Sequence, residues 1–378
     1  MVLSYDDMLR ADDRTELEKR QITQADLDKQ IARLNLGTVP LKILRPCHLE
    51  DGITRISDTQ GSEYRHAWAE AVDKGRISKF IPASGAATRM FQALLQSQTN
   101  PSHPEKLLSD LGANLEKFPF FFALSHALQQ QGQQLETLRD SQNFMPILNA
   151  LLNPEGLNYA NLPKALLPFH RYHREIRTAL EEHMHDGVRL IQNSRQPVRC
   201  HITVSPEHRE TVQHHLTAIT KTWADSHRTL EWAISMQAPA TETIALDQHK
   251  NPVRTETDTL LFRPGGHGAL LWNLQQCGGD IVLISNIDNV VPEHLKPPIL
   301  GWRTLLGGCL ATLQERIAAL LDALAQAQDQ ESTLRECETF IQRELHDPLP
   351  SFYSQWTTQG KRAFFQGHFN RPIRVCGM

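Results

Sequence analysis

The chain has 378 residues, a formal net charge of −4 at neutral pH and a hydrophobic content of 40 %. This composition is typical of a globular protein, and the acidic balance argues against a nucleic-acid partner. No stretch approaches the length of a membrane span, and the first residues lack the pattern of a secretion signal. The six scattered cysteines form no Cys-x-x-Cys pair, so we expect reduced thiols and a cytoplasmic protein without a membrane partner.

The first half of the chain contains one predicted strand among helices. Residues 1–75 are predicted to be a polar helical extension, with one helix that begins after Thr23 and runs to about Leu34. Residues 76–83 are predicted to form a strand, and a loop of small residues then leads into a helix over 88–95. Residues 96–160 are predicted to be a helical insertion.

The second half alternates strands with helices. Strands are predicted at 197–204, 230–236 and 281–284, β-structure with turns at 241–262, and helices at 174–192, after Ser205 and at 294–328. This alternation predicts an α/β fold with a mostly parallel sheet and helices on both faces. We expect an α/β domain at 76–293, followed at 294–378 by a helical region that ends in an unfinished strand from Val375.

The loop after the first predicted strand is a candidate phosphate site. Ser84, Gly85, Ala86 and Ala87 place small residues and backbone N–H groups before a helix, an arrangement that favours anions. Arg89 follows within one turn and could add a charge-assisted hydrogen bond. The alternative is that the small residues serve only close packing.

A second candidate region spans 262–290. Gly265, Gly266 and Gly268 leave the backbone bare around His267, which allows a ligand to approach closely. Asp288 follows the strand at 281–284 and should lie at the carboxyl edge of the sheet, where ligands of α/β folds bind. One such carboxylate, together with phosphate oxygens, is a typical Mg²⁺ site. The alternative is that the glycines serve only turn geometry.

Lys164 is a third candidate. It lies in the segment Asn161-Leu-Pro-Lys-Ala-Leu-Leu-Pro, whose prolines keep it off a helix and present it from a stiff loop. The alternative is an ordinary solvated surface lysine.

These segments, taken in order, resemble those of the sugar-nucleotide pyrophosphorylases. The resemblance pairs the residues from Ser84 to Met90 with a glycine-rich loop, Pro163-Lys164 with a Pro-Lys segment and Asp288 with a metal-binding aspartate. Gly266-His267-Gly268 and Asn286-Ile287-Asp288-Asn289 resemble segments of the UDP-sugar branch. Two departures are an unusually long stretch between Arg89 and Lys164, and Ala87 in place of the second loop glycine.

The whole chain also resembles the bacterial domain of unknown function 4301 family. The hallmarks of that family match Phe80–Met90, Lys164–His170, Thr203–His208, Phe262–Leu270 and Arg371–Met378.

The pyrophosphorylase resemblance implies a Rossmann-like sheet of the glycosyltransferase-A type. It further implies a nucleotidyltransferase that joins a nucleoside triphosphate, with UTP favoured, to a sugar 1-phosphate and releases pyrophosphate. Lys164 would neutralise phosphate charge and Asp288 would hold Mg²⁺. The triphosphate would be bound by Ser84, Gly85, Ala86, Ala87, Thr88 and Arg89, and the base by Gln237, Gly265, Gly266, His267 and Gly268.

Two other functions fit the same pattern. One is a protein that binds a nucleotide or a sugar nucleotide without turnover. The other is a glycosyltransferase on the same fold, in which Asp288 would hold the metal on a nucleotide-sugar donor.

Overall fold

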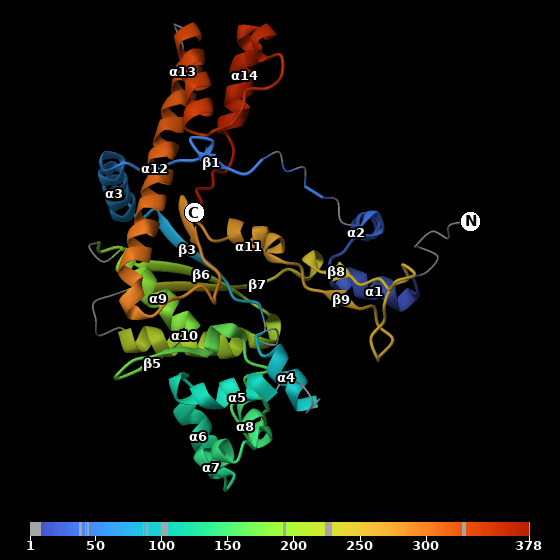
Figure 1. The fold of residues 1–378 in the computed structure, drawn as a ribbon. Helices are drawn as coiled ribbons and strands as arrows, with labels where there is room; N and C mark the ends of the chain where they lie inside the picture. Colours follow the sequence, from blue (N-terminus) through green and yellow to red (C-terminus); the bar gives the residue numbers. More distant parts are fainter. Residues whose placement is uncertain are drawn as a thin grey trace.

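The centre of the molecule is a four-stranded parallel sheet (Figure 1). The computed structural model describes residues 9–37, 40–41, 43, 45–85, 87, 90–99, 105–191, 194–223, 229–326 and 330–377. The sheet has the strand order β10–β3–β6–β7. The strands are β3 (Ile77–Pro82), β6 (Val198–Val204), β7 (Leu230–Met236) and β10 (Ile281–Ile284), as predicted from their apolar runs. The chain is therefore an α/β protein.

The two central strands are the most buried. All six residues of β3 are buried, and so are six of the seven residues of β6. Their register places Lys79 opposite Cys200 and Ile81 opposite Ile202. Since all four strands run in the same direction, their carboxyl ends lie at one edge of the sheet, which is where ligands of such folds collect.

Helices cover both faces of this sheet (Figure 1). α9 (Ala179–Leu190) and α10 (Arg209–Trp223) pack their apolar residues against one face, in a core with Ile81 and Ile202. The short α11 (Leu271–Gln275) covers the other face, where Asn273 Nδ2 donates to Ser235 Oγ at 2.8 Å. The arrangement agrees with the predicted helices on both faces.

Two long helices lie against each other beside β10 and β3. α3 (Asp58–Asp73) contributes Trp68 and α12 (Lys296–Gln326) contributes Leu300 to a core that includes Ile281. The close approach depends on a glycine, because a Cβ atom on Gly308 would lie 1.8 Å from the Tyr64 carbonyl oxygen. Any side chain at that position would push the two helices apart.

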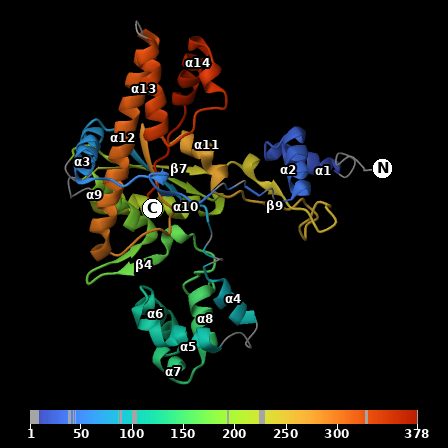
Figure 2. The same ribbon diagram turned by 45° about the horizontal axis from the view of Figure 1, so that its top comes forward.

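The segment 92–152 forms a helical lobe with its own apolar core. Figures 1 and 2 both show this lobe beyond the edge of the sheet layer. The first helix begins at Gln92 rather than at residue 88, and residues 88–89 lie outside the described residues. The helices are α4 (Gln92–Thr99), α5 (Glu105–Asn114), α6 (Phe121–Gln130), α7 (Leu135–Asp140) and α8 (Phe144–Leu152).

The prediction of a helix from residue 174 was wrong. Residues 168–178 form a hairpin of β4 (Pro168–Arg171) and β5 (Ile176–Thr178), and α9 begins only at Ala179. Thr178 sets this start, because its hydroxyl accepts from the Glu181 amide while the Glu181 carboxylate accepts from the Thr178 amide. Such a capping box satisfies the exposed amides of the first helical turn.

The N-terminal helices dock on the second half of the chain. α1 (Ala11–Lys19) and α2 (Gln24–Leu36) share a small core with the hairpin of β8 (Thr243–Ile244) and β9 (Phe262–Arg263). Thr23 caps α2, as predicted, by accepting from the Asp26 amide at 3.2 Å. Two short strands, β1 (His48–Leu49) and β2 (Gly52–Ile53), pair in the connection to α3.

The C-terminal region is helical, as predicted, but its end is not a strand. α13 (Gln330–Arg343) and α14 (Thr358–Phe369) pack on the second half of α12 (Figure 1). Residues 372–377 pair with no strand and adopt no regular structure, so the strand expected from Val375 was a wrong prediction. Among the described helices, none is both long enough and apolar enough to cross a bilayer.

Candidate functional site

Backbone hydrogen bonds join the candidate segments at the carboxyl edge of the sheet. The loop after β10 continues the sheet pairing, because the Ile287 amide donates to the Pro82 carbonyl at 3.3 Å. The loop after β3 contacts the Pro-Lys segment, where the Ala87 amide donates to the Leu162 carbonyl at 3.4 Å. Segments distant in sequence thus form one surface at the end of β3 and β10.

Lys164 and Asp288, 124 positions apart, form a direct ion pair across this edge. Lys164 lies on the short helix η4 (Lys164–Leu166), and its Nζ donates to Asp288 Oδ2 at 2.7 Å. The Lys164 side chain is 22 % exposed and that of Asp288 is 41 % exposed, so solvent and ligands can reach the pair. The hydrogen bond from Lys164 lowers the pKa of Asp288, and the nearby His267 lowers it further.

The glycines beside this pair differ in what they contact. A Cβ atom on Gly265 would lie 2.7 Å from the Ala269 Cβ and 2.9 Å from the Thr241 carbonyl oxygen, so packing alone requires glycine there. A Cβ atom on Gly85, Gly266 or Gly268 would meet no atom within 4 Å. Their backbones therefore border open space, which is where a ligand could approach closely.

Gln237 has a structural role that the sequence did not indicate. Its Nε2 donates to Thr241 Oγ1 at 3.1 Å and, at 3.4 Å, to the carbonyl of Gly265. The side chain thus holds the glycine-rich segment against the end of β7. Its proposed contact with a base stays a prediction.

The small-residue loop is described only in part. Ser84 and Gly85 follow β3 at the partly exposed edge. Ala87 is fully buried in the core of the helical lobe, and its amide is already bound to Leu162, so that amide is not available to a phosphate. The predicted roles of Ala86, Thr88 and Arg89 fall outside the described residues.

His183 supports the loop that carries Asp288 and was not identified from the sequence. Its buried imidazole lies on α9, and Nε2 faces the carbonyl oxygens of Asn286 at 3.0 Å and Ile287 at 3.2 Å. Burial, together with the nearby Lys79, shifts the pKa of His183 well below its ordinary value, so the ring is neutral and donates from Nε2. A histidine among the apolar positions of an amphipathic helix was the available signal.

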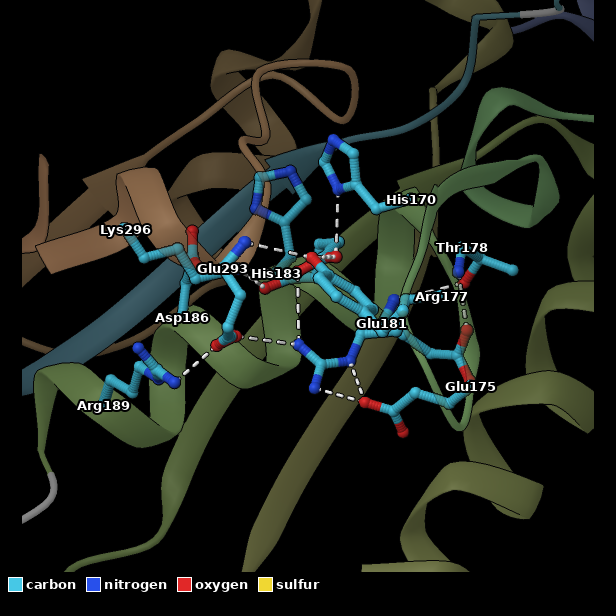
Figure 3. Close-up of polar contacts among 12 residues, drawn as sticks. His170, Glu175, Arg177, Thr178, Glu181, His183, Asp186, Arg189, Glu293 and Lys296 are labelled. Carbon is cyan, nitrogen blue, oxygen red and sulfur yellow. Dashed lines mark hydrogen bonds and ion pairs between the residues drawn. The ribbon is translucent and has the colours of Figure 1, made fainter. Parts of the chain in front are cut away.

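A buried group of charges lies behind His183 (Figure 3). The Nζ of Lys296, from α12, lies 2.7 Å from Glu182 Oε2 and also bonds to Asp186, both on α9. Arg303 Nη1 donates to Asp186 Oδ2 at 2.8 Å. We call these four residues the α9–α12 charge cluster. Each carboxylate has a cationic partner, so the cluster is internally neutralised.

Glu182 is the most enclosed member of this cluster. Its Oε1 lies 2.9 Å from His170 Nδ1 and accepts from the Tyr172 hydroxyl at 2.6 Å, and both of these residues belong to the β4–β5 hairpin. Burial would raise the pKa of Glu182, but hydrogen bonds from Lys296 and Tyr172 lower it below its ordinary value. Glu182 therefore stays ionised and ties the hairpin to α9 and α12.

Lys79 adds a further buried cation on the central strand. Its Nζ donates to the His183 carbonyl at 2.8 Å, and burial lowers the pKa of Lys79 to about 8. This lysine connects β3 directly to the helix that positions the Asp288 loop.

The edge could accept Mg²⁺ together with a phosphate ligand. Within the described ranges there is no group of three or more His, Cys, Asp or Glu side chains able to enclose a metal. Asp288, flanked by the exposed Asn286 and Asn289, offers one carboxylate, and Mg²⁺ is commonly held by one or two carboxylates, waters and substrate phosphates. The residues present therefore fit Mg²⁺ that arrives with a polyphosphate.

Comparisons with known proteins give one family and one distant structure. No curated protein matches the chain. A crystal structure of a candidate UDP-N-acetylglucosamine pyrophosphorylase from Entamoeba histolytica matches with 12 % identity and a TM-score of 0.37, over 69 % of this chain and 50 % of the other. The chain spans about half the length of that protein, and a likeness at this level carries no argument. The family model of a domain of unknown function, DUF4301, matches residues 10–378, so the chain belongs to that family.

Proposed function

We propose that the protein is a nucleotidyltransferase that joins a nucleoside triphosphate to a sugar 1-phosphate and releases pyrophosphate. The observation that carries the proposal is the Lys164–Asp288 pair at the carboxyl edge of the parallel sheet, beside glycines that border open space. UTP is the favoured triphosphate through the sequence resemblance alone. Mg²⁺, when bound with the triphosphate, would neutralise phosphate charge and orient the phosphate oxygens.

The chain's own residues would act by position and charge. An oxygen of the sugar phosphate attacks the α-phosphorus, the bond from that phosphorus to the bridging oxygen breaks, and pyrophosphate leaves. Lys164 would exchange Asp288 for a phosphate oxygen, and Asp288 would then be available to the metal. Ser84 and Gly85 would offer backbone amides to the triphosphate, and Gly266 and Gly268 would leave room for the base.

The direct test is pyrophosphate release from a panel of nucleoside triphosphates and sugar 1-phosphates. We expect Asp288→Ala and Lys164→Met each to lower the turnover by at least about 100-fold, the size of effect seen when one preorganised electrostatic group is removed. Asp280→Ala is a matched control, because Asp280 lies at the opposite end of β10 and pairs with Arg76 at 2.9 Å. Lys74→Met is the matched control for Lys164→Met, because it makes the same substitution at a lysine outside the proposed site. Near-normal turnover in either site variant would contradict the mechanism.

Pyrophosphate release, read together with melting temperature and with turnover of nucleotide sugars, distinguishes the other two candidate functions from the nucleotidyltransferase. A protein that binds without turnover would show a Mg²⁺-dependent rise in melting temperature with a nucleotide, lost in Asp288→Ala, but no pyrophosphate. A glycosyltransferase would hydrolyse or transfer from a nucleotide sugar and would not exchange pyrophosphate. No response to any nucleotide or nucleotide sugar would exclude all three.

A further inference from the structure

A cavity of about 580 Å³ lies in the helical lobe, and neither Lys164 nor Asp288 lines it. It is partly open and is bordered by α4, α5, α8 and the start of β4, with Leu94, Leu111, Leu151 and Phe169 among its lining residues. Its volume falls within the range of small-molecule sites, whereas protein interiors leave few voids larger than a water molecule. The cavity is therefore large enough for a ligand and too large for a packing defect.

The lining selects an apolar ligand. Among the lining residues that the structure describes, all except Asp110 and Asn114 are apolar or aromatic. Tyr159 also lines the cavity and is buried, and its hydroxyl has no hydrogen-bond partner among the residues that the structure describes. A ligand that fills this space would be mostly hydrocarbon.

The surroundings of the cavity carry cations without carboxylate partners. Lys117 Nζ donates at 2.8 Å to Oδ1 of Asn114, a lining residue, and Arg171 Nη2 donates at 2.7 Å to the Glu116 carbonyl. Neither side chain has an ion pair within the described part of the chain. The Glu116 carboxylate near these cations bonds to Arg139 at 2.8 Å. Among the described lining residues, Asp110 is the one with a carboxylate. These charges favour an anionic head group beside Lys117 and Arg171.

We propose that this cavity binds the hydrocarbon chain of a long-chain carboxylate, with the carboxylate facing Lys117 and Arg171. The proposal does not depend on the nucleotidyltransferase activity. The hydrocarbon chain could belong to a free fatty acid or to an acyl ester or thioester of a larger acidic molecule, in which another anionic group of that molecule would take the place of the carboxylate. The position of the cavity next to η4, through Leu167 and Pro168, would let an occupied cavity affect the segment that carries Lys164.

Calorimetric titration of the full chain with saturated carboxylates tests the proposal. For chains of about 8 to 16 carbons we expect the dissociation constant to fall about fourfold for each added methylene group until the cavity is full. Ala93→Trp, which projects from α4 into the lining, should weaken binding at least about tenfold. Gln96→Trp is the matched control, because Gln96 is exposed on the same helix and does not line the cavity. Leu107→Trp, from α5, repeats the test should Ala93→Trp fail to fold.

Two further experiments test whether the ligand carries an anionic group and whether it is a free acid or an acyl chain on a larger molecule. Lys117→Gln, on the short helix η3 (Leu115–Lys117), should weaken binding of the carboxylate severalfold and leave that of the matching uncharged alcohol unchanged. Lys106→Gln, on α5, should change neither. Tighter binding of an acyl-coenzyme A than of the free acid would indicate a carried acyl chain. Absence of binding for every chain length, or equal weakening by Ala93→Trp and Gln96→Trp, would overturn the proposal.

Discussion

The α9–α12 charge cluster and the Lys164–Asp288 pair are both built from a lysine and carboxylates, yet their surroundings differ sharply. In the cluster, Glu182 is 0 % exposed and Lys296 is 1 % exposed, and each carboxylate bonds to more than one partner. In the pair, Asp288 bonds to one cation among the described residues and is 41 % exposed. Buried charges must be fully compensated within the protein, whereas a half-exposed pair can exchange its partner for a ligand. The comparison indicates a structural role for the cluster, and it supports the binding role that we propose for the pair.

The largest loss of stability should follow from replacing one residue of the α9–α12 charge cluster. Lys296→Met leaves Glu182 and Asp186 buried without their shared cation, and we expect a loss of about 3–5 kcal/mol in the free energy of unfolding. Urea denaturation measures it, with Lys74→Met as the control at less than about 0.5 kcal/mol. A loss below about 1 kcal/mol for Lys296→Met would show that the cluster is hydrated and open in solution.

Two neighbouring glycines should respond in opposite ways. Gly265→Ala forces its Cβ against Ala269 and the Thr241 carbonyl, and we expect a loss of about 1–3 kcal/mol in unfolding free energy. Gly266→Ala meets open space and should change stability by less than about 0.5 kcal/mol while weakening any ligand that approaches that backbone. Thermal melts with and without nucleotide distinguish the two. Equal destabilisation would mean that both glycines serve packing.

His183 should give the fold a specific dependence on pH. Its pKa is lowered in the folded state, so the unfolded state binds the proton more strongly below about pH 6.5. Its contribution to stability is present above the unfolded pKa and is lost at about 1.4 kcal/mol per pH unit below it. His183→Gln keeps an N–H donor and removes this slope. The pKa values of His201 and His185 are also lowered by burial, so a smaller slope should remain.

Urea unfolding of the wild type and of His183→Gln at about pH 7 and about pH 5 measures how much of the pH dependence of stability comes from His183. His201→Gln serves as the matched control, because it removes a buried histidine whose ring contacts Ser235 and Phe80 rather than the Asp288 loop. If His183→Gln also lowers nucleotide binding while His201→Gln does not, His183 acts as a positioning residue for that loop. Identical slopes in wild type and His183→Gln would contradict the neutral, buried ring.

The sequence was sufficient for the sheet and for naming Lys164 and Asp288 as candidates, although their direct contact was not predicted. Apolar β-branched runs predicted all four strands, and the parallel order then brings residues that follow β10 to the edge that Lys164 reaches. The α9–α12 charge cluster could not be predicted, because Glu182 and Lys296 resemble solvated residues on polar helix faces. Their pairing depends on the packing of two helices separated by more than 100 positions.

The errors arose where local signals competed. Residues 174–178 were assigned to a helix, although the Thr178–Glu181 capping box starts that helix at Ala179 and leaves the preceding residues to a hairpin. The bond from Gln237 to the carbonyl of Gly265 is a contact that only the tertiary structure reveals, and the predicted contact of Gln237 with a base stays a prediction. The cavity in the helical lobe was likewise invisible, because its lining residues have the pattern of an ordinary core.

The Lys164–Asp288 pair should contribute far less to stability than the α9–α12 charge cluster. Lys164 holds the pKa of Asp288 below its ordinary value, so the pair stabilises the fold above the unfolded pKa of about 3.9 and loses that contribution as the pH falls through the folded value. Solvent screens a pair this exposed, and we expect Lys164→Met and Asp288→Ala each to change the unfolding free energy by less than about 1 kcal/mol. Urea denaturation in low and high salt measures this change. A loss as large as that of Lys296→Met would make the pair a structural bridge between η4 and the β10 loop; a small loss with failed turnover would leave it as binding chemistry.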